Sequence, residues 1–211
     1  MSIAFMAVTT SSMAQSLNKM NWLNEPQQWE IKDGKTLVMD VPAKTDFWRI
    51  SHYGFTVDDG PFYYATYGGE FEAKVKITGN YVTTFDQMGL MLRIDHENWI
   101  KAGVEYVDGK QNVSAVVTHR TRSVVQLPDA PRSIWIKAVR RLDAVEIFFS
   151  RDDKEYIMIR TCWLQDNCPV MVGLMGACPD GKGFTATFEE FKVTPLADQR
   201  RLEWAKRQMN K

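Results

Sequence analysis

The sequence predicts an all-β fold, an antiparallel β-sandwich followed by a short C-terminal helix. Three observations carry this prediction. Turn signals such as Asp33-Gly34, Gly79-Asn80 and Asp108-Gly109 recur at short intervals along the 211 residues. The segments between them are short and alternate apolar with polar residues, or are rich in β-branched side chains. The 7 Trp, 7 Tyr and 11 Phe also suit pleated, half-buried surfaces.

Ten strands and one helix follow from this pattern. The expected strands cover residues 36–41, 69–77, 89–95, 99–107, 112–119, 133–141, 144–150, 156–161, 170–175 and 184–193. Residues 196–209 are rich in helix formers and place Leu202, Ala205 and Met209 along one face, so we expect a helix there, with Trp204 packed onto the sandwich. Three parts are therefore predicted: a disordered leader over residues 1–19, a sandwich domain over 20–195 and a helical tail over 196–211.

Charge and composition narrow the partners. The 26 basic and 26 acidic residues cancel, whereas binding to nucleic acid or to an anionic membrane rewards a basic excess. No stretch approaches the ~20 apolar residues that cross a bilayer. We therefore expect neither a nucleic-acid nor a membrane partner. We also expect no metal and no cofactor, because no ligand set or motif for either stands out.

The first residues and the cysteines bear on the compartment. Residues 3–8 are apolar and Ala14 resembles a cleavage position, yet no Lys or Arg precedes Lys19 and the apolar run is shorter than the ~7–15 residues of a signal core. The three cysteines lack the spacing of a disulfide framework or a zinc site, which favours thiols in a reducing compartment. A cytoplasmic protein is the main expectation, and export with a trimmed signal is the alternative.

The Asp108-Gly109 pair predicts a tight hairpin and with it a register. A type I′ turn needs φ > 0 at both central residues, which this pair tolerates. Counting outward pairs Val104 with Val113 and Glu105 with Asn112. One face of the two strands is then apolar and is expected to lie in the core; it consists of Ile100, Ala102, Val104, Val113, Ala115 and Val117.

The preceding strand can be added by the same logic. A three-residue loop over 96–98 pairs Ile94 with Ile100 and keeps the apolar face apolar. This register sets Arg93 opposite Lys101. Two cations facing each other cost stability unless something negative lies between them. Gly103, in the middle of the same face, is expected to leave room for a bound group.

The polar face of these three strands is the main candidate site. It carries Arg93, Lys101, Glu105, Asn112 and Ser114, with Trp99 at its end. One interpretation is the solvated face of a half-buried sheet. The other is a carbohydrate site, because stacking rings beside hydrogen-bond donors and acceptors are what a sugar requires. Four further candidates lie nearby in the expected fold: Asp86 and Gln87 before one strand, and Trp48 and His52 in an aromatic segment.

Several segments together resemble a known family. They are residues 45–48 (TDFW), 53–55 (YGF), 69–75 (GEFEAKV), 85–93 (FDQMGLMLR), 99–109 (WIKAGVEYVDG) and 172–175 (VGLM) leading to Gly183-Phe184. The chain is similar over about residues 20–195 to an uncharacterised bacterial and fungal domain family, the regulation of enolase protein family. The resemblance implies a concanavalin A-like jelly roll and a cytoplasmic link to carbohydrate metabolism. Gly60-Pro61-Phe62 departs from the Gly-His-Phe of other members, which leaves no histidine there.

Three functions remain open from the sequence. The first is a carbohydrate-binding or carbohydrate-metabolism-linked regulatory protein whose ligand is a sugar or sugar phosphate. The second is a glycan hydrolase with Glu105 and Asp86 as acid and base, although the close carboxylate spacing of sandwich-fold glucanases is missing. The third is a protein-interaction module that regulates a metabolic enzyme. In the first, hydrogen bonds would come from Arg93, Lys101, Glu105 and Asn112, and stacking from Trp99 or Trp48.

Overall fold

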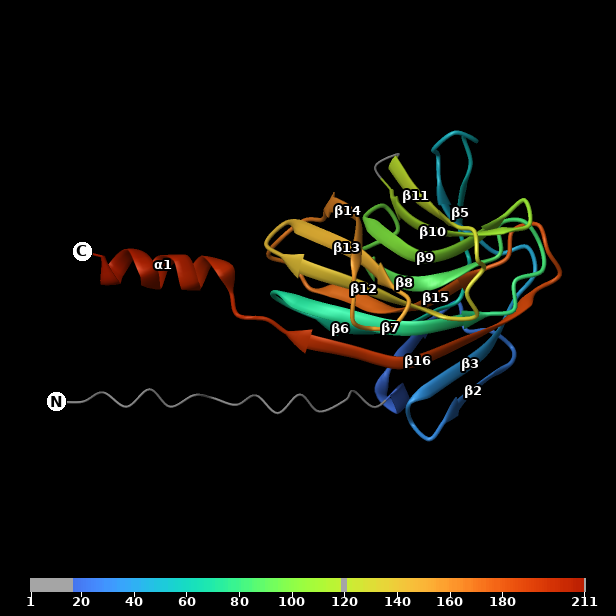
Figure 1. Ribbon diagram of the computed structural model, residues 1–211, viewed down its shortest axis with the longest axis horizontal. Coiled ribbons are helices and arrows are strands. Elements are labelled where there is room, and N and C mark those ends of the chain that lie inside the picture. The colour runs from blue at the N-terminus through green and yellow to red at the C-terminus, as the bar shows by residue number, and fades with distance from the viewer. Residues whose placement is uncertain (1–16, 119–120, 211) are drawn as a thin grey trace.

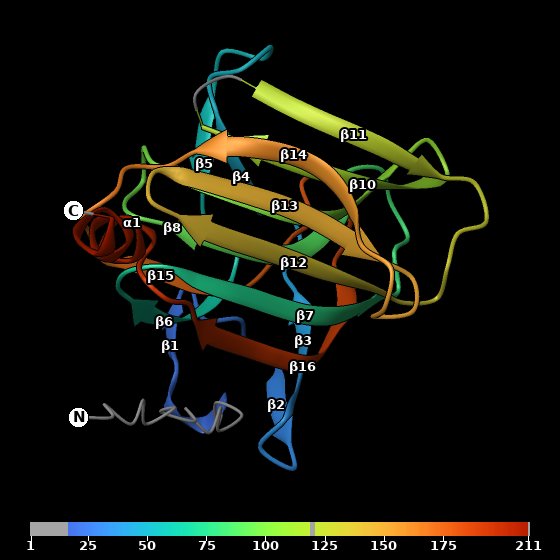
Figure 2. The ribbon, with the colours of Figure 1, turned by 60° about the vertical axis from the view of Figure 1, so that its left-hand side comes forward.

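The computed structural model describes residues 17–118 and 121–210 and shows two antiparallel sheets packed face to face (Figure 1). The first sheet has seven strands in the order β1-β6-β15-β8-β9-β10-β11, and the second has seven in the order β14-β13-β12-β7-β16-β3-β2. Strands β4 and β5 form a separate hairpin, which rises above both sheets (Figure 2). The predicted all-β sandwich with a C-terminal helix is confirmed.

The strand bounds follow the chain from the first sheet to the second and back. They are β1 Asn21–Leu23, β2 Trp29–Lys32, β3 Thr36–Val41, β4 Phe47–Arg49, β5 Thr56–Asp58, β6 Phe62–Tyr67, β7 Phe71–Gly79, β8 Gln87–Arg93, β9 Trp99–Val107, β10 Lys110–Val117, β11 Thr121–Leu127, β12 Ile134–Arg141, β13 Ala144–Ser150, β14 Ile157–Trp163, β15 Val170–Ala177 and β16 Phe184–Pro195. All ten expected strands are present, with ends shifted by up to two residues. The six that the sequence did not predict include four short ones, β1, β2, β4 and β5, whose alternation is too brief to recognise.

The core lies between the two sheets. The six residues predicted for it in β9 and β10 are at most 5% exposed, and they pack in one cluster with apolar residues of β7, β12 and β13. Burial of this surface is the main driving force for folding. It leaves the opposite face of β8, β9 and β10 outside the main core.

The hairpin register is confirmed and the register of the preceding strand is wrong. Asp108 and Gly109 adopt φ of 50° and 77°, and Val104 pairs with Val113 as predicted. Lys101, however, lies opposite Met91, and Arg93 lies opposite Trp99. The partners are thus shifted by two residues, which keeps every side chain on its predicted face.

A capped loop explains this shift. The connection between β8 and β9 covers five residues, 94–98, and not three. Within it the carboxylate of Asp95 accepts hydrogen bonds from the backbone N–H groups of Glu97 and Asn98, both at 2.8 Å. These bonds stabilise the longer turn, and they hold the Asp95 pKa below its usual range although its slight burial opposes this.

Gly103 serves strand packing, contrary to the expectation that it opens space for a ligand. A Cβ atom at Gly103 would lie 1.9 Å from the carbonyl oxygen of Met88, and one at Gly89 would lie 2.0 Å from that of Ala102. No side chain fits at such distances. The two glycines pair directly across β8 and β9 and let the strands approach.

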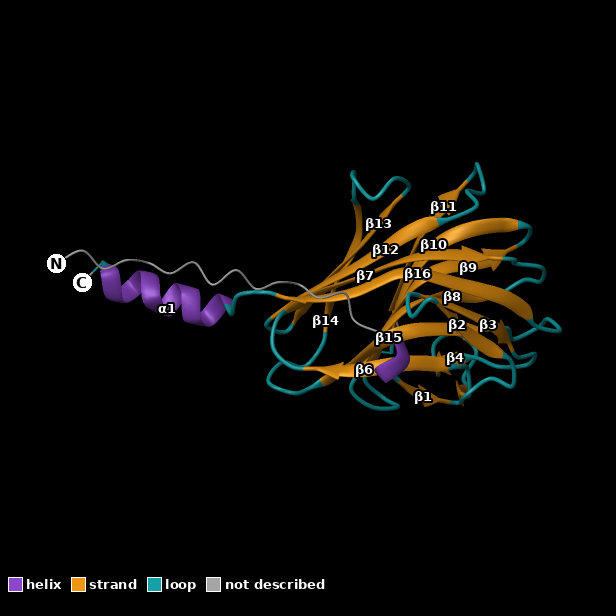
Figure 3. Cartoon of the chain, turned by 90° about the horizontal axis from the view of Figure 1, so that it is seen from below, coloured by secondary structure: helices purple, strands orange, loops and turns teal. Residues whose placement is uncertain are grey.

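Both ends of the sandwich domain differ from the prediction. Leu17–Lys19 form a 3₁₀ turn in which Leu17 is buried, so ordered structure begins inside the expected leader; residues 1–16 lie outside the described part. The helix α1, Gln199–Met209, starts three residues late because the Asp198 side chain caps it by accepting the N–H of Arg201. It projects away from the sandwich (Figures 1 and 3), with Trp204 63% exposed, so the expected packing of Trp204 is wrong.

Candidate functional site

The polar face of β8, β9 and β10 is buried. Its members Arg93, Lys101, Glu105, Asn112 and Ser114 are each at most 7% exposed. The segment from residue 46 to residue 58, which contains β4 and β5, lies over this face and contacts it through two cations. The interpretation as a solvated face is therefore wrong, and the face must be understood together with its cover.

Lys101 is the first of these cations. Its Nζ donates to the carbonyl oxygen of Phe47 and to Oε1 of Gln87, both at 2.6 Å, and lies 3.6 Å from Oδ1 of Asp46. The same ammonium lies 5.7 Å from the ring centroids of Trp48 and Trp99. A buried ammonium needs such partners because its desolvation is costly. Lys101 thus ties β4 to the sheet.

Arg93 is the second. Its two terminal nitrogens donate to the two carboxylate oxygens of Asp58 at 2.5 and 2.6 Å, a bidentate pair. The Arg93 side chain is 6% exposed and that of Asp58 is 29% exposed. Because Asp58 ends β5, this pair holds the second strand of the hairpin against the sheet.

Two other predicted residues have internal roles. Trp99 is 2% exposed and packs with Phe47 and Val116 in a small apolar cluster under the hairpin, so it offers no open stacking surface. Asn112 donates through its side chain to the backbone carbonyls of Lys110 and Glu105, at 3.1 and 3.4 Å. Both residues shape the face from below.

Asp86 lies on the other side of the sheet from Glu105. Gln87 is the residue that pairs with Glu105 in the register, so its neighbour Asp86 points toward the core. The Asp86 carboxylate accepts the N–H groups of Val82 and Thr83 at 2.8 Å and is fully buried. Burial, helped by the hydrogen bond with Asp86, raises the pKa of Cys178 to about 11. The predicted acid–base pair of Asp86 and Glu105 therefore does not share a cleft.

An aromatic cavity opens beside the covered face, where β4, the start of β8 and the loop after β15 meet. Its volume is about 210 Å³. The residues that line it are Asp46, Trp48, Tyr53, Phe55, Phe85, Gln87, Glu105, Pro179 and Asp180. The structure thus brings three predicted site residues, Trp48, Gln87 and Glu105, into one cavity with aromatic walls and polar groups.

The rim of this cavity is an exposed aromatic loop between β4 and β5. Tyr53 and Phe55 are 54% and 46% exposed, and their rings stack with centroids 5.7 Å apart. Trp48 lies 5.7 Å from Tyr53, and its indole N–H donates to the carbonyl of Ser51. His52 is exposed at the tip and makes an edge contact with Tyr53. It contributes to the loop and not to the cavity wall.

The loop also carries backbone strain. Ile50 has φ of 59°, a left-handed value that a β-branched residue rarely adopts. A hydrogen bond from the N–H of Gly54 to the Ile50 carbonyl, at 2.8 Å, closes the turn around it. Such conformations cost roughly 1–3 kcal/mol and concentrate at functional segments.

Sequence reasoning missed much of the cavity. Tyr53, Phe55 and Asp46 belong to segments that carry the family resemblance, so that resemblance was the available signal. Phe85 and Asp180 reach the cavity from loops at distant positions, with Phe85 in a left-handed conformation of φ 72°. No local pattern announces such residues.

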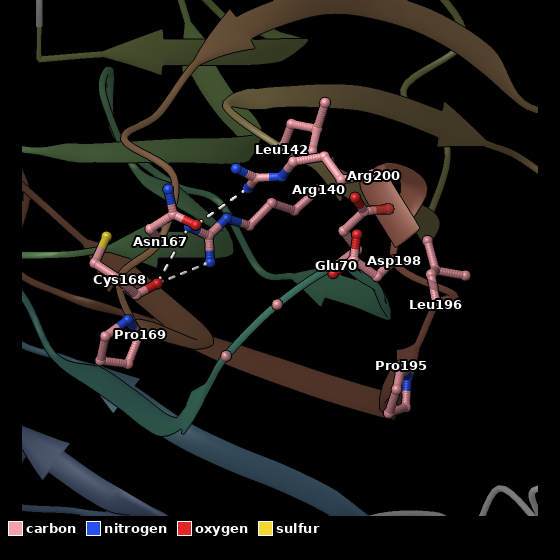
Figure 4. Close-up of a pocket in the computed structure, with 12 residues that line it drawn as sticks. Glu70, Arg140, Leu142, Asn167, Cys168, Pro169, Pro195, Leu196, Asp198 and Arg200 are labelled. Carbon is pink, nitrogen blue, oxygen red and sulfur yellow. Dashed lines mark hydrogen bonds between the residues drawn. The ribbon is translucent and has the colours of Figure 1, made fainter. Parts of the chain in front are cut away.

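A second cavity, of about 520 Å³, lies at the opposite end of β15, between the β6–β7 turn and the tail (Figure 4). Its buried Arg140 donates to the backbone carbonyls of Gln165 and Cys168. Arg200 pairs with Asp166 at 3.2 Å. These side chains hold loops and the tail together, so we assign this cavity a structural role.

Two other kinds of site were searched for in the same coordinates. Over residues 17–118 and 121–210 no group of three or more His, Cys, Asp or Glu side chains could hold a metal ion. Helix α1 is too short and too polar to cross a bilayer, and the described residues contain no helix that could.

Comparison with known proteins places the fold among sugar-active and sugar-binding sandwiches. The chain is similar to the GH43 BlXynB protein from Bacillus licheniformis, with a TM-score of 0.62 and 14% identity over 82% of this chain and 36% of that one. It is also similar to lectin I-B4 from Griffonia simplicifolia, with a TM-score of 0.55 and 8% identity over 84% and 93% of the two chains. At such identities only the fold is shared, and it confirms the concanavalin A-like class.

Two yeast comparisons are much nearer. "Regulation of enolase protein 1" from Saccharomyces cerevisiae is 33% identical over 180 residues, which cover 84% of this chain and 90% of that protein. A solved structure of a functionally unknown protein from Saccharomyces cerevisiae has a TM-score of 0.79 and 32% identity, and the match covers 87% of this chain and all of that one. Residues 22–196 match the family described as "Protein of unknown function (DUF1349)", and the chain belongs to that family.

Proposed function

We propose that the protein binds a carbohydrate in the aromatic cavity beside the β4–β5 hairpin. The observation that carries this proposal is the combination of stacking surfaces, from Trp48 and Phe85, with an amide and carboxylates from Gln87 and Glu105 in one cavity. Sugars are recognised by rings that stack on their C–H faces and by polar groups that hydrogen-bond their hydroxyls. The similarity in fold to a lectin supports the same reading.

The geometry suggests the size of the ligand and the role of each group. A cavity of about 210 Å³ is smaller than the roughly 300–1,000 Å³ of drug-sized sites, so it suits a single sugar ring. Trp48 would stack on the ring, and Gln87 with Glu105 would bind hydroxyls. Lys101 and Arg93 act indirectly, since they hold the hairpin that forms one wall.

Hydrolysis by Glu105 and Asp86 receives no support from the geometry. A glycosidase needs two carboxyl groups about 5–10 Å apart across one cleft. Asp86 points into the opposite side of the sheet, where two backbone N–H groups hold its carboxylate. We therefore favour binding without this pair.

Regulation of a metabolic enzyme is the second candidate function. The yeast relative is named a regulator of enolase, and the loop at the cavity rim exposes Ile50, Tyr53 and Phe55. Aromatic side chains of this kind are enriched at protein interfaces. A sugar-responsive contact through this loop would join the two functions. All three cysteines are unpaired, which supports the expected cytoplasmic setting.

Titration calorimetry against a panel of monosaccharides tests the binding proposal. We expect wild-type protein to bind at least one sugar, and Trp48→Ala to weaken that binding at least tenfold, since stacking contacts contribute about 0.5–1.5 kcal/mol beyond the buried area. Trp135→Ala is the matched control because Trp135 lies on β12 of the other sheet. Equal loss in both variants, or no heat with any sugar, would refute the assignment.

A further inference from the structure

We infer that the aromatic cavity prefers a sugar that carries a protonated amine and disfavours a sugar phosphate. This inference rests on the proposed carbohydrate function and specifies the charge of the ligand. It follows from three features of the cavity: the charges of its lining, the ammonium that the same residues already hold, and the shortage of donors for an anion.

The lining is acidic. Three of its nine residues, Asp46, Glu105 and Asp180, are carboxylates, and none of these nine described residues is Lys, Arg or His. Two ammonium groups lie close but outside the lining. Lys101 lies behind Asp46, and Lys44 donates to the backbone carbonyl of Asp180 at 2.8 Å. A ligand in the cavity therefore meets carboxylates first.

The cavity wall already binds one ammonium from behind. Nζ of Lys101 lies 5.7 Å from the Trp48 ring centroid and 2.6 Å from Oε1 of Gln87. An aromatic face attracts a cation through its quadrupole, most strongly when the cation is desolvated. Because Trp48 and Gln87 also line the cavity, the chemistry that holds Lys101 is available, on the other side, to an amine of a ligand.

An anionic sugar lacks corresponding partners. Proteins hold phosphate with Arg or Lys side chains or with backbone N–H groups at a helix N-terminus. The two cations nearest the site are committed to the hairpin, Lys101 to Phe47 and Arg93 to Asp58. A phosphate would instead face the three carboxylates, and the repulsion would reduce its affinity.

Calorimetry with four matched probes tests this inference: glucosamine, glucose, N-acetylglucosamine and glucose 6-phosphate. We expect glucosamine to bind at least about tenfold more tightly than glucose and N-acetylglucosamine, and glucose 6-phosphate to bind most weakly. Asp180→Asn should reduce the preference for glucosamine about threefold or more and leave glucose binding unchanged. Asp143→Asn, an exposed carboxylate on the β12–β13 turn, is the control and should change neither affinity.

The outcomes separate this inference from the function on which it rests. Equal binding of glucosamine and glucose would overturn the preference for an amine while the carbohydrate function stands. Tightest binding of glucose 6-phosphate would do the same. Absence of binding by all four sugars would overturn both. In support, the affinity for glucosamine should fall as the pH rises through the pKa of its amine, and the affinity for glucose should stay constant.

Discussion

Replacement of Lys101 by Met removes the ammonium that ties β4 to the first sheet and keeps most of the aliphatic stem. The variant loses the bonds from Nζ to the Phe47 carbonyl and to Gln87 Oε1, both 2.6 Å long in the native protein. It also leaves the Asp46 carboxylate, 3.6 Å away, without this counter-charge.

The expected loss in the free energy of unfolding is about 2–4 kcal/mol. Hydrogen bonds from a charged group contribute about 1.5–3 kcal/mol each. Breaking a buried ion pair from one side costs about 3–5 kcal/mol. Part of this cost is offset, because Met avoids the desolvation of an ammonium at a site that is only 5% exposed.

Urea denaturation measures this loss, and hydrogen exchange shows where it falls. The backbone amides of β4 should lose protection first, because the hairpin separates from the sheet before the core unfolds. Lys110→Met is the control: Lys110 is exposed at the start of β10, and its replacement should change stability by less than about 0.5 kcal/mol. A loss below about 1 kcal/mol for Lys101→Met, or unchanged exchange in β4, would refute the role of Lys101.

Three further predictions follow from the same structure. Asp58→Asn leaves the Arg93 charge buried without its bidentate partner and should cost about 2–4 kcal/mol in urea denaturation; a stability equal to wild type would contradict this. Gly103→Ala should destabilise by more than about 3 kcal/mol or prevent folding, because its Cβ would lie 1.9 Å from a backbone oxygen, whereas Gly68→Ala, with nothing within 4 Å, should be tolerated in thermal melts. The pKa of Cys178 is raised from 9.0 to about 11 in the folded protein, so its stabilising effect should be complete below pH 9 and lost as the pH rises through 11; denaturation measured across that range checks the sign, and an early gain in stability would contradict it.

The sequence predicted well whatever depends on local pattern. Asp108-Gly109 has the backbone freedom that a type I′ turn demands, and the alternation on both sides of it allows one register only. The register of β8 was less determined, since a shift by two residues preserves the alternation. Only the side-chain cap at Asp95 distinguishes the two loops, and its effect is not visible in apolar periodicity.

The candidate site was predictable only in part, for a related reason. The alternation in β9 correctly grouped Lys101 and Glu105 on one face, but it contained no information on what covers that face. The cover comes from Phe47 and Asp58, which meet the sheet through contacts 54 and 35 residues apart in the chain. Such long-range contacts decide whether a polar face is open or buried, and the cavity exists only because they form.

A crystal structure of the protein soaked with glucosamine tests the central claim most directly. The account predicts the sugar ring in the aromatic cavity, stacked on Trp48 or Phe85, with its amine within about 3 Å of a carboxylate oxygen of Asp46, Glu105 or Asp180. A sugar bound instead in the cavity beside Arg140, or an empty aromatic cavity in crystals of a protein that binds the sugar in solution, would contradict it.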